Sequence, residues 1–257
     1  MNRARWGQVQ QKIIEWSSVA FLSVLIILPT CMLGWLLFFT DTFAVSAITV
    51  VDAKDHTSEK VRTITEKSIG QNLLFIPTEQ LEQKILLDVP QVRDVHMVRK
   101  LPGTLKIIVQ EKQPAILLIS GGSYYFVDAE GIAYEQALLD VLPGVVLPTV
   151  KNSDANATVT LGTNAVETQF VTFIQEALQK LPSITGAQIA EMRIPSLATK
   201  EVHFYLDKNW RVLMDTTRSA KDQIGILELL LADTISDQEK QTLEYIDLRI
   251  PNRVYYK

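Results

Sequence analysis

The stretch of residues 16–40 constrains the fold more than any other part of the sequence, because it contains no Asp, Glu, Lys, Arg or His. Leu, Ile, Val and Phe dominate it. Roughly 20 apolar residues in a helix cross the hydrocarbon core of a bilayer. A single segment in lipid must satisfy its own backbone as a helix. The sequence therefore predicts a transmembrane helix over residues 16–40, in which Pro29 and Gly34 are tolerated.

The charges that flank this stretch predict its orientation. Arg3, Arg5 and Lys12 precede it, whereas the first basic residue after it is Lys54. The positive-inside rule then places the N-terminal tail in the cytoplasm and the rest of the chain beyond the membrane. A cleaved signal peptide is the competing interpretation, since Val45-Ser46-Ala47 would serve as a cleavage site. Its apolar region would be only about 7–15 residues long, so we favour the anchor.

The composition of the remaining part of the chain excludes some functions. It carries 22 basic and 28 acidic residues, and this acidic excess argues against nucleic-acid binding, which needs a basic stripe. The one cysteine, Cys31, lies in the apolar stretch. The part beyond the membrane therefore needs no disulfide, which is typical of a bacterial exported domain.

Residues 43–114 show the pattern of a small α+β domain. Alternating apolar residues predict strands around residues 48–50, 95–97 and 105–109, the last two joined by a tight turn at 101–104. We expect one helix to be capped by His56-Thr57-Ser58 and a second by Thr78, with Pro90 ending the second. The expected order is β-α-α-β-β, with a core that includes Leu81, Ile85, Val95, Ile107 and Val109.

Short motifs in this block carry a family resemblance. They are Gly70-Gln71-Asn72-Leu73, the run Val92-x-x-Val95-x-Met97-x-Arg99-x-Leu101-Pro102, and Glu111-Lys112-Gln113-Pro114. Together with the preceding anchor and strand, they resemble a POTRA domain of the kind found in the FtsQ/DivIB family of bacterial division proteins. One departure is visible, because the family often has a Gly after the first strand, where this chain has Val51-Asp52-Ala53.

Residues 115–257 predict a second, mixed α+β region. Residues 123–127 and 132–135 are expected to pair across the turn Asp128-Ala129-Glu130-Gly131, in which Gly131 takes a positive φ. A calcium loop is the alternative for these acids, but the ligand spacing is absent. Residues 138–148 suit a packed loop with a short strand. A hairpin around Asp207-Lys208-Asn209 should join strands at 202–206 and 211–214.

Two apolar stripes at helical spacing lie in this region. One covers residues 170–181 and is expected to end at Pro182, and the other is formed by Ala220, Ile224, Leu227 and Leu231. A partner-binding groove would show the same spacing, but core burial is the usual reason for it. The chain closes with residues 245–249 and 252–257, predicted as its last two strands, and the triplet Asp247-Leu248-Arg249 resembles the end of the FtsQ-type β-domain.

The expected organisation is therefore a cytoplasmic tail (1–15), a transmembrane helix (16–40), a POTRA domain (43–114) and an FtsQ-type β-domain (115–257), which together make an α+β protein. We find no catalytic set, cofactor site or metal site in the sequence. His56, His96 and His203 lie in separate contexts, and no nucleophile elbow or phosphate-binding glycine loop occurs. The sequence favours a protein that is not an enzyme.

The resemblance implies a function as a membrane-anchored scaffold of the division machinery. Such a protein would bind FtsB-like and FtsL-like single-pass proteins and other divisome components, help control septal peptidoglycan synthesis, and gather at the septum in the cytoplasmic membrane. A POTRA-type chaperone or docking protein in envelope protein transport is the alternative. It ranks lower because the region after residue 115 shows helical stripes rather than the strands of a membrane barrel. An envelope-anchored enzyme ranks lowest.

The expected partner-binding residues lie near the C-terminus, where an exposed strand edge can accept a partner strand by β-augmentation. Tyrosines suit such an interface because they combine a large contact area with a polar tip. The alternative is an ordinary edge strand without a partner, in which Arg253 and Lys257 protect the edge from aggregation. The predicted residues are Tyr245, Asp247, Arg249, Asn252, Arg253, Val254, Tyr255 and Tyr256.

Overall fold

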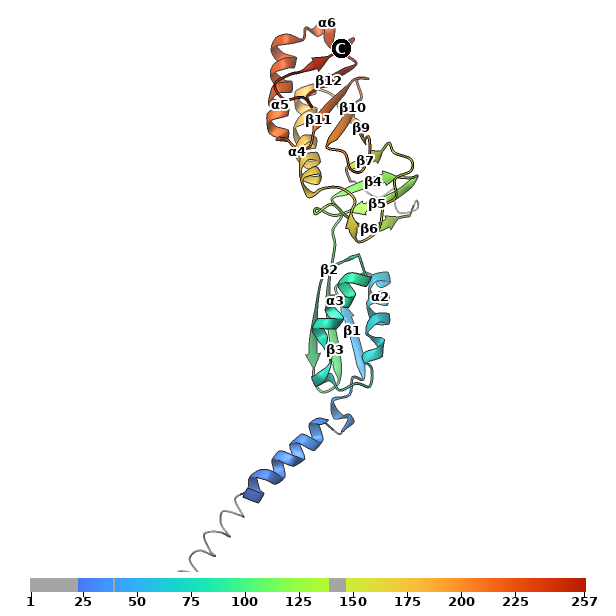
Figure 1. The fold of residues 1–257 in the computed structure, drawn as a ribbon, viewed down its shortest axis with the longest axis vertical. Coiled ribbons are helices and arrows are strands. Elements are labelled where there is room, and N and C mark those ends of the chain that lie inside the picture. The colour runs from blue at the N-terminus through green and yellow to red at the C-terminus, as the bar shows by residue number, and fades with distance from the viewer. Residues whose placement is uncertain (1–22, 39, 139–146) are drawn as a thin grey trace, which may run out of the picture. The chain divides into compact units, whose positions relative to one another are not determined.

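The computed structural model of this chain describes residues 23–38, 40–138 and 147–257. These residues form two compact units (Figure 1). The first unit comprises Met1–Ile85 and Asp94–Gln110, and the second comprises Leu86–Arg93 and Glu111–Lys257. The expected packed loop at 138–148 falls largely outside the described residues.

The first unit contains a three-stranded sheet with the strand order β1-β3-β2. Strand β1 (Ala47–Val51) pairs in parallel with β3 (Thr104–Glu111), and β2 (Val92–Lys100) lies on the other side of β3. Helices α2 (Asp55–Thr65) and α3 (Thr78–Asp88) pack beside the sheet (Figure 1). The β-α-α-β-β order is therefore confirmed. Its fully buried core includes Val61, Leu73, Ile85, Leu105 and Ile107.

Three details of the first unit differ from the expectation or explain it. Helix α2 begins at Asp55 after the N-cap Lys54, so the prediction that residues 56–58 cap it is wrong. Thr57 instead lies within the first turn of the helix, where its side chain is buried against the rest of the unit. Leu81 is only half-buried, whereas Ile85 on the same helix is fully buried. Asp52 has φ +62°, a conformation that Gly would adopt without strain.

The second unit contains a ten-stranded sheet with the order β13-β12-β11-β10-β9-β7-β4-β5-β6-β8. The strands are β4 (Ile116–Ser120), β5 (Ser123–Val127), β6 (Ile132–Ala137), β7 (Thr149–Asn152), β8 (Thr163–Asn164), β9 (Ile189–Ile194), β10 (Glu201–Leu206), β11 (Arg211–Asp215), β12 (Tyr245–Asp247) and β13 (Tyr255–Tyr256). The hairpins β5–β6 and β10–β11 are confirmed. Strand β4 was not predicted.

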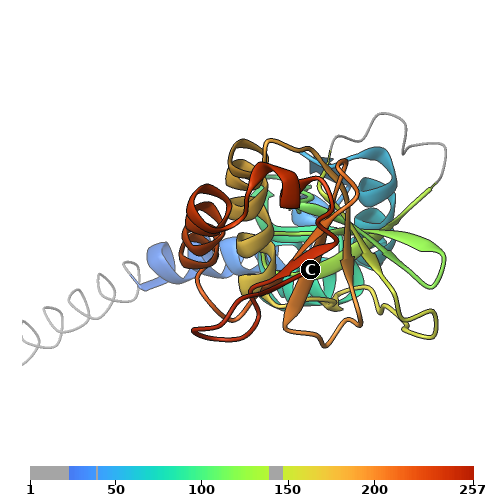
Figure 2. The ribbon, with the colours of Figure 1, turned by 90° about the horizontal axis from the view of Figure 1, so that it is seen from above.

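Helices α4 (Thr168–Thr185) and α5 (Ala220–Leu229) lie on the same side of strands β10 and β11 (Figure 2). A turn of π-helix (Leu230–Thr234) and the short α6 (Asp237–Lys240) follow α5. Both helical stripes are buried in one hydrophobic core, against Phe204, Met214 and Ile246 of the sheet. The default of core burial for these stripes is therefore correct.

Helix α4 continues past Pro182, so the expectation that Pro182 ends it is wrong. The helix ends at Thr185, followed by Gly186 with φ +59°. Leu181 is fully buried and anchors this last turn in the core. A proline removes one backbone donor from a helix, and near the C-terminus this loss is offset by the burial of the adjacent residue.

The turn between β5 and β6 is built around the carboxylate of Asp128. This carboxylate accepts a hydrogen bond from Ile132 N over 2.9 Å and lies 2.6 Å from Lys112 Nζ. Gly131 has φ +87°, as expected. Because the oxygens of Asp128 already bind protein donors, a structural turn accounts for this acid without a metal.

The apolar stretch near the N-terminus is described in part. Residues 23–38 are helical and expose many large apolar side chains, whereas residues 16–22 and 39 of the predicted span lie outside the described residues. Within the part of the chain that the structure describes, no helix combines the length and the apolar character needed to cross a bilayer.

Candidate partner-binding edge

Strand β13 forms one edge of the ten-stranded sheet. It pairs antiparallel with β12, with Tyr256 opposite Ile246 and Tyr255 opposite Asp247. Next to these pairs, Lys257 and Tyr245 exchange both backbone hydrogen bonds, over 3.2 and 3.3 Å. In an antiparallel ladder such pairs alternate with pairs that do not bond each other. The backbone N–H and C=O of Tyr256 therefore point away from β12, towards the free edge.

The side chains along this edge are exposed and mixed in character. Tyr255 and Tyr256 are 46% and 43% exposed, and Ile250 in the preceding turn is 45% exposed. Val254 is half-buried and packs against the hydrophobic core of the second unit, so its side chain holds β13 against that core. The edge thus combines an outward-facing backbone donor and acceptor, which strand addition requires, with two aromatic rings on opposite faces that can add contact area.

Arg249 ties the end of β12 to the start of β10. Its Nε and Nη2 donate to Asp247 Oδ1 and Oδ2 over 2.9 and 2.7 Å. Its Nη1 donates to Glu201 Oε2 over 2.5 Å. The backbone N–H of Arg249 also donates to Asp247 Oδ1, over 3.0 Å. One guanidinium therefore bridges two carboxylates from strands that are far apart in the sequence.

This network shifts the pKa values of its members. Burial alone would raise the pKa of Asp247, but the hydrogen bonds from Arg249 outweigh it and hold this pKa below its usual range. The hydrogen bond to Asp247 raises the pKa of Arg249. Burial lowers the pKa of His203, whose Nε2 lies 3.3 Å from Glu201 Oε1. The charged carboxylate and guanidinium and the neutral imidazole are thus the favoured forms.

The sheet face next to this network carries a second set of paired charges. The guanidinium groups of Arg193 and Arg211 lie 4.5 and 5.6 Å from the ring centre of Tyr205. Glu191 pairs with Arg193 and lies 3.8 Å from Lys151. Glu191 is the one acid among these charged groups, and Arg211 lies over the Tyr205 ring. This face offers little apolar area for docking, so we place the candidate site at the edge.

The structure divides the predicted site residues into two groups. Tyr245, Asp247 and Arg249 belong to β12 and the turn after it, where Asp247 is buried and the other two are half-buried. The exposed group is formed by Asn252, Arg253, Tyr255 and Tyr256, with Val254 half-buried among them. Asn252 has φ +60° and helps to turn the chain into β13.

Sequence reasoning missed Glu201 of β10 as a partner of Arg249. Glu201, His203 and Tyr205 recur at every second position of β10 and line its face opposite the core. This polar alternation was the available signal, because alternate residues of a strand share a face. The pairing of Arg249 with Glu201 could not be predicted from this alternation, because the two residues lie on different strands far apart in the sequence.

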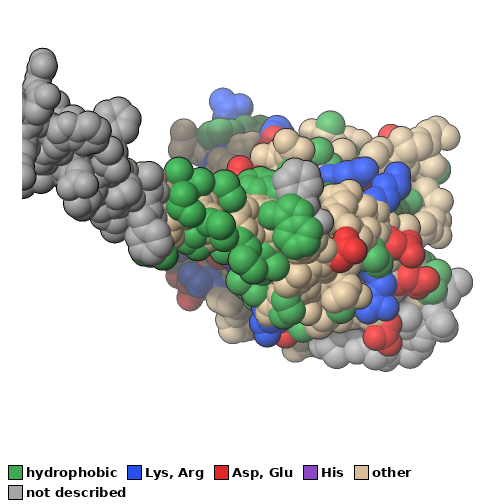
Figure 3. Space-filling view, turned by 90° about the horizontal axis from the view of Figure 1, so that it is seen from below, with side chains coloured by type: hydrophobic (Ala, Val, Ile, Leu, Met, Phe, Trp, Pro, Cys, Tyr) green, Lys and Arg blue, Asp and Glu red, His purple; other side chains and the backbone are tan. Residues whose placement is uncertain are grey.

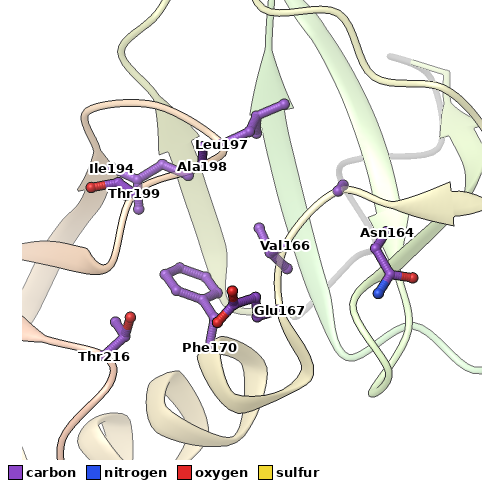
Figure 4. Close-up of a pocket in the computed structure, with 10 residues that line it drawn as sticks. Asn164, Val166, Glu167, Phe170, Ile194, Leu197, Ala198, Thr199 and Thr216 are labelled. Carbon is purple, nitrogen blue, oxygen red and sulfur yellow. The ribbon is translucent and has the colours of Figure 1, made fainter.

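A cleft of about 240 Å³ lies elsewhere in the second unit, between the start of α4 and the loop after β9 (Figure 4). Phe170, Val166 and Leu197 contribute apolar walls, and Glu167 at its rim pairs with Lys200. Glu167 is the one titratable group among the residues that line it. Among the described residues, no cluster of His, Cys, Asp or Glu could hold a metal ion.

Comparison with known proteins identifies the first unit. Residues 43–112 match the family of POTRA domains described as FtsQ-type. The FtsQ cell-division protein of Streptomyces griseus is 30% identical over 87 residues, which cover 34% of this chain and 41% of that protein. The DivIB cell-division protein of Clostridium acetobutylicum is 28% identical over 105 residues, which cover 41% of this chain and 42% of that protein.

A longer match extends into the second unit. The FtsQ cell-division protein of Chloroflexus aurantiacus is 24% identical over 233 residues, which cover 91% of this chain and 80% of that protein. By contrast, this chain matches only about two fifths of the length of the Streptomyces griseus and Clostridium acetobutylicum relatives. The fold of the first unit, the FtsQ-type match and these relatives agree. Residues 43–112 thus match a POTRA domain of the FtsQ type, and the chain is similar over most of its length to an FtsQ cell-division protein.

Proposed function

We propose that this chain is a non-enzymatic, membrane-anchored scaffold of the division machinery, and that strand β13 is the edge on which a partner segment docks. The partners would be FtsB-like and FtsL-like single-pass proteins, and the complex would help control septal peptidoglycan synthesis. The observation that carries the proposal is the outward-facing backbone of Tyr256 on an exposed edge strand. The cell-division relatives support the cellular role.

Docking at this edge is physically reasonable because the edge strand has backbone groups that no neighbouring strand among the described residues pairs with. An unpaired strand edge offers backbone groups that a second strand can satisfy without altering the fold. Tyr255 and Tyr256 add contact area on both faces, and Arg253 adds positive charge, whereas Lys257 is paired with Glu244 over 3.0 Å. An acidic or amphipathic strand would therefore complement this edge better than a basic one.

The proposed anchor is the apolar stretch of residues 16–40. Its absence of charged residues and the exposed apolar side chains of residues 23–38 support this role. The basic residues before it favour a cytoplasmic N-terminus, with both compact units on the other side of the membrane. A reporter that is active only outside the cytoplasm, fused after Lys257, should be active, and activity of a cytoplasm-only reporter there would contradict this topology.

The edge is tested by removing its outward donor. Tyr256→Pro in the full chain deletes the N–H that faces the free edge and leaves the bonds between Lys257 and Tyr245 in place. We expect this variant to keep its melting midpoint within a few degrees and to lose capture of a purified FtsB-like partner. Tyr256→Ala is the matched control, because it removes the ring but keeps the N–H, and it should retain part of the capture.

Val254→Pro is a second variant on the same outward side of the strand, although the half-buried side chain of Val254 makes it the less clean test. Normal capture by a folded Tyr256→Pro chain would rule out the backbone of β13 as the docking edge. The cellular role is tested separately by the position of a fluorescently tagged chain. We expect a midcell band in dividing cells, and uniform membrane fluorescence would favour the envelope-transport alternative.

A further inference from the structure

Three large apolar side chains are exposed on the first unit. Ile69 is 53% exposed, Phe75 56% and Leu101 61%. They lie in three separate connections: after a 3-10 turn (Glu66–Ser68), at the end of a second one (Leu73–Phe75), and between β2 and β3. Pro102, also exposed, follows Leu101. We call Ile69, Phe75, Leu101 and Pro102 the apolar end.

Hydrogen bonds hold these three connections at one end of the unit. The segment that enters β1 bonds to two of them, through Gly70 N to Val45 O over 3.0 Å and through Ser46 N to Gly103 O over 2.8 Å. Arg99, near the end of β2, joins the third, since its Nε donates to Leu73 O over 3.0 Å. The apolar end is therefore a fixed feature of the fold and not a chance position of flexible loops.

The same end receives the chain from the apolar helix of residues 23–38. The ring of Phe75 stacks on that of Phe38, with 5.0 Å between their centres, and Asn72 Nδ2 donates to Leu37 O over 2.6 Å. Val45 follows Phe38 by seven positions, so the two residues lie at most roughly 25 Å apart even in a fully extended chain. Apolar side chains gather on the face drawn in Figure 3.

Basic side chains flank the apolar end. Lys67 and Lys100 are exposed there, beside the acids Asp41 and Glu66, whereas the guanidinium of Arg99 binds groups of the unit itself. Apolar side chains that sink into the headgroup region, with Lys and Arg beside them at the phosphates, are the pattern of a surface that lies on a bilayer. Exposed apolar side chains that lie together, as at the apolar end, are unfavourable in water and mark a surface that binds a partner or a membrane.

We propose that the apolar end docks on the surface of the lipid bilayer, with Ile69, Phe75 and Leu101 inserted among the headgroups. This inference rests on the proposed membrane anchor, because the anchor would hold the apolar end next to lipid at a high effective concentration. A protein partner or a second copy of the chain could cover the same end. Lipid is favoured by the covalent link to the apolar helix and by the flanking basic residues. Docking would set the height and tilt of the first unit above the membrane.

The test places a fluorescent label at defined sites of the full chain in pure lipid vesicles. The native Cys31 reports on the helix. In a Cys31→Ser background, Leu101→Cys and Ile69→Cys report on the apolar end. Glu59→Cys is the matched control, because it is exposed near the start of α2, at the other end of the unit. The vesicles contain phosphatidylcholine, phosphatidylglycerol and a lipid with a nitroxide quencher high on its acyl chain.

We expect quenching at Cys31, Leu101→Cys and Ile69→Cys, and much weaker quenching at Glu59→Cys. Quenching at Cys31 with no more quenching at Leu101→Cys and Ile69→Cys than at Glu59→Cys would overturn the docking and leave the anchor standing. No quenching at Cys31 would overturn the anchor and this inference with it. Weak quenching at Leu101→Cys that rises when the chain is diluted in lipid would show that a second copy covers the apolar end, and it would contradict lipid docking.

Discussion

Arg249 Nη1 and Glu201 Oε2 lie 2.5 Å apart and join the turn after β12 to the first residue of β10. Lys cannot reproduce this bridge, because it lacks the planar fork that also holds Asp247. We expect Arg249→Lys to lower the free energy of unfolding by about 1–2 kcal/mol, after allowing for the partial exposure of the pair. Urea denaturation of the full chain in detergent measures this change.

The control for this variant is Arg253→Lys, four residues further along. Arg253 is exposed at the start of the edge, and exposed substitutions change stability by less than about 0.5 kcal/mol. Equal urea midpoints for Arg249→Lys and Arg253→Lys would show that the bridge contributes no stability.

His203 should make stability depend on pH. Burial lowers its pKa below the ordinary value of 6.5, with Arg249 and Arg211 adding to the shift and Glu201 opposing it. The unfolded chain then binds a proton more readily than the folded one, so stability falls as the pH drops below about 6.5. We expect His203→Gln to show a shallower loss of stability than the wild type between about pH 7 and pH 5.

Thermal unfolding at a series of pH values checks this prediction. His96→Gln is the matched control, because His96 is exposed in the first unit, and it should keep the wild-type decline. A His203→Gln chain with the full wild-type decline would assign the pH dependence to other groups.

The first unit offers a pair of core substitutions that differ in burial. Ile107 is fully buried in β3, whereas Leu81 in α3 is half-buried. We expect Ile107→Ala to cost about 2–5 kcal/mol of unfolding free energy and Leu81→Ala at most about 2 kcal/mol. Chemical denaturation of both variants measures these changes. A larger loss of unfolding free energy for Leu81→Ala than for Ile107→Ala would mean that Leu81 lies on the buried face of α3.

Gly131 and Gly122 form a second matched pair, since both have a positive φ, of +87° and +78°. An added Cβ at Gly131 would collide with Val166 O, whereas nothing lies within 4 Å of one at Gly122. Gly122→Ala should cost about 1–2 kcal/mol through backbone strain alone. Gly131→Ala should cost more, because Val166 must also move. Similar melting midpoints for the two variants would contradict the tight contact at Gly131.

The sequence determined the features that depend on neighbouring residues. Alternating apolar residues located β1 and β3, and the turn Asp207-Lys208-Asn209 located the β10–β11 hairpin. The apolar stripes of α4 and α5 predicted which faces are buried. These predictions succeed because side-chain periodicity reports directly on the local backbone and on the buried face.

Local rules failed where packing outweighed them. Pro182 lies inside α4 because the burial of Leu181 sustains the last turn, and α2 begins earlier than its cap residues suggested because Thr57 is needed on the inner face. Strand β4 was missed because its residues are mostly buried and lack the polar alternation of an exposed strand.

The candidate site shows the same division between local and tertiary information. The C-terminal sequence alone predicted a tyrosine-bearing strand near residues 252–257. The sequence also predicted a free edge there, but only the tertiary structure decided that the backbone of Tyr256 faces outward and that Arg249 reaches Glu201. Strand order and register are set by contacts between residues far apart in the chain, so no local pattern contains them.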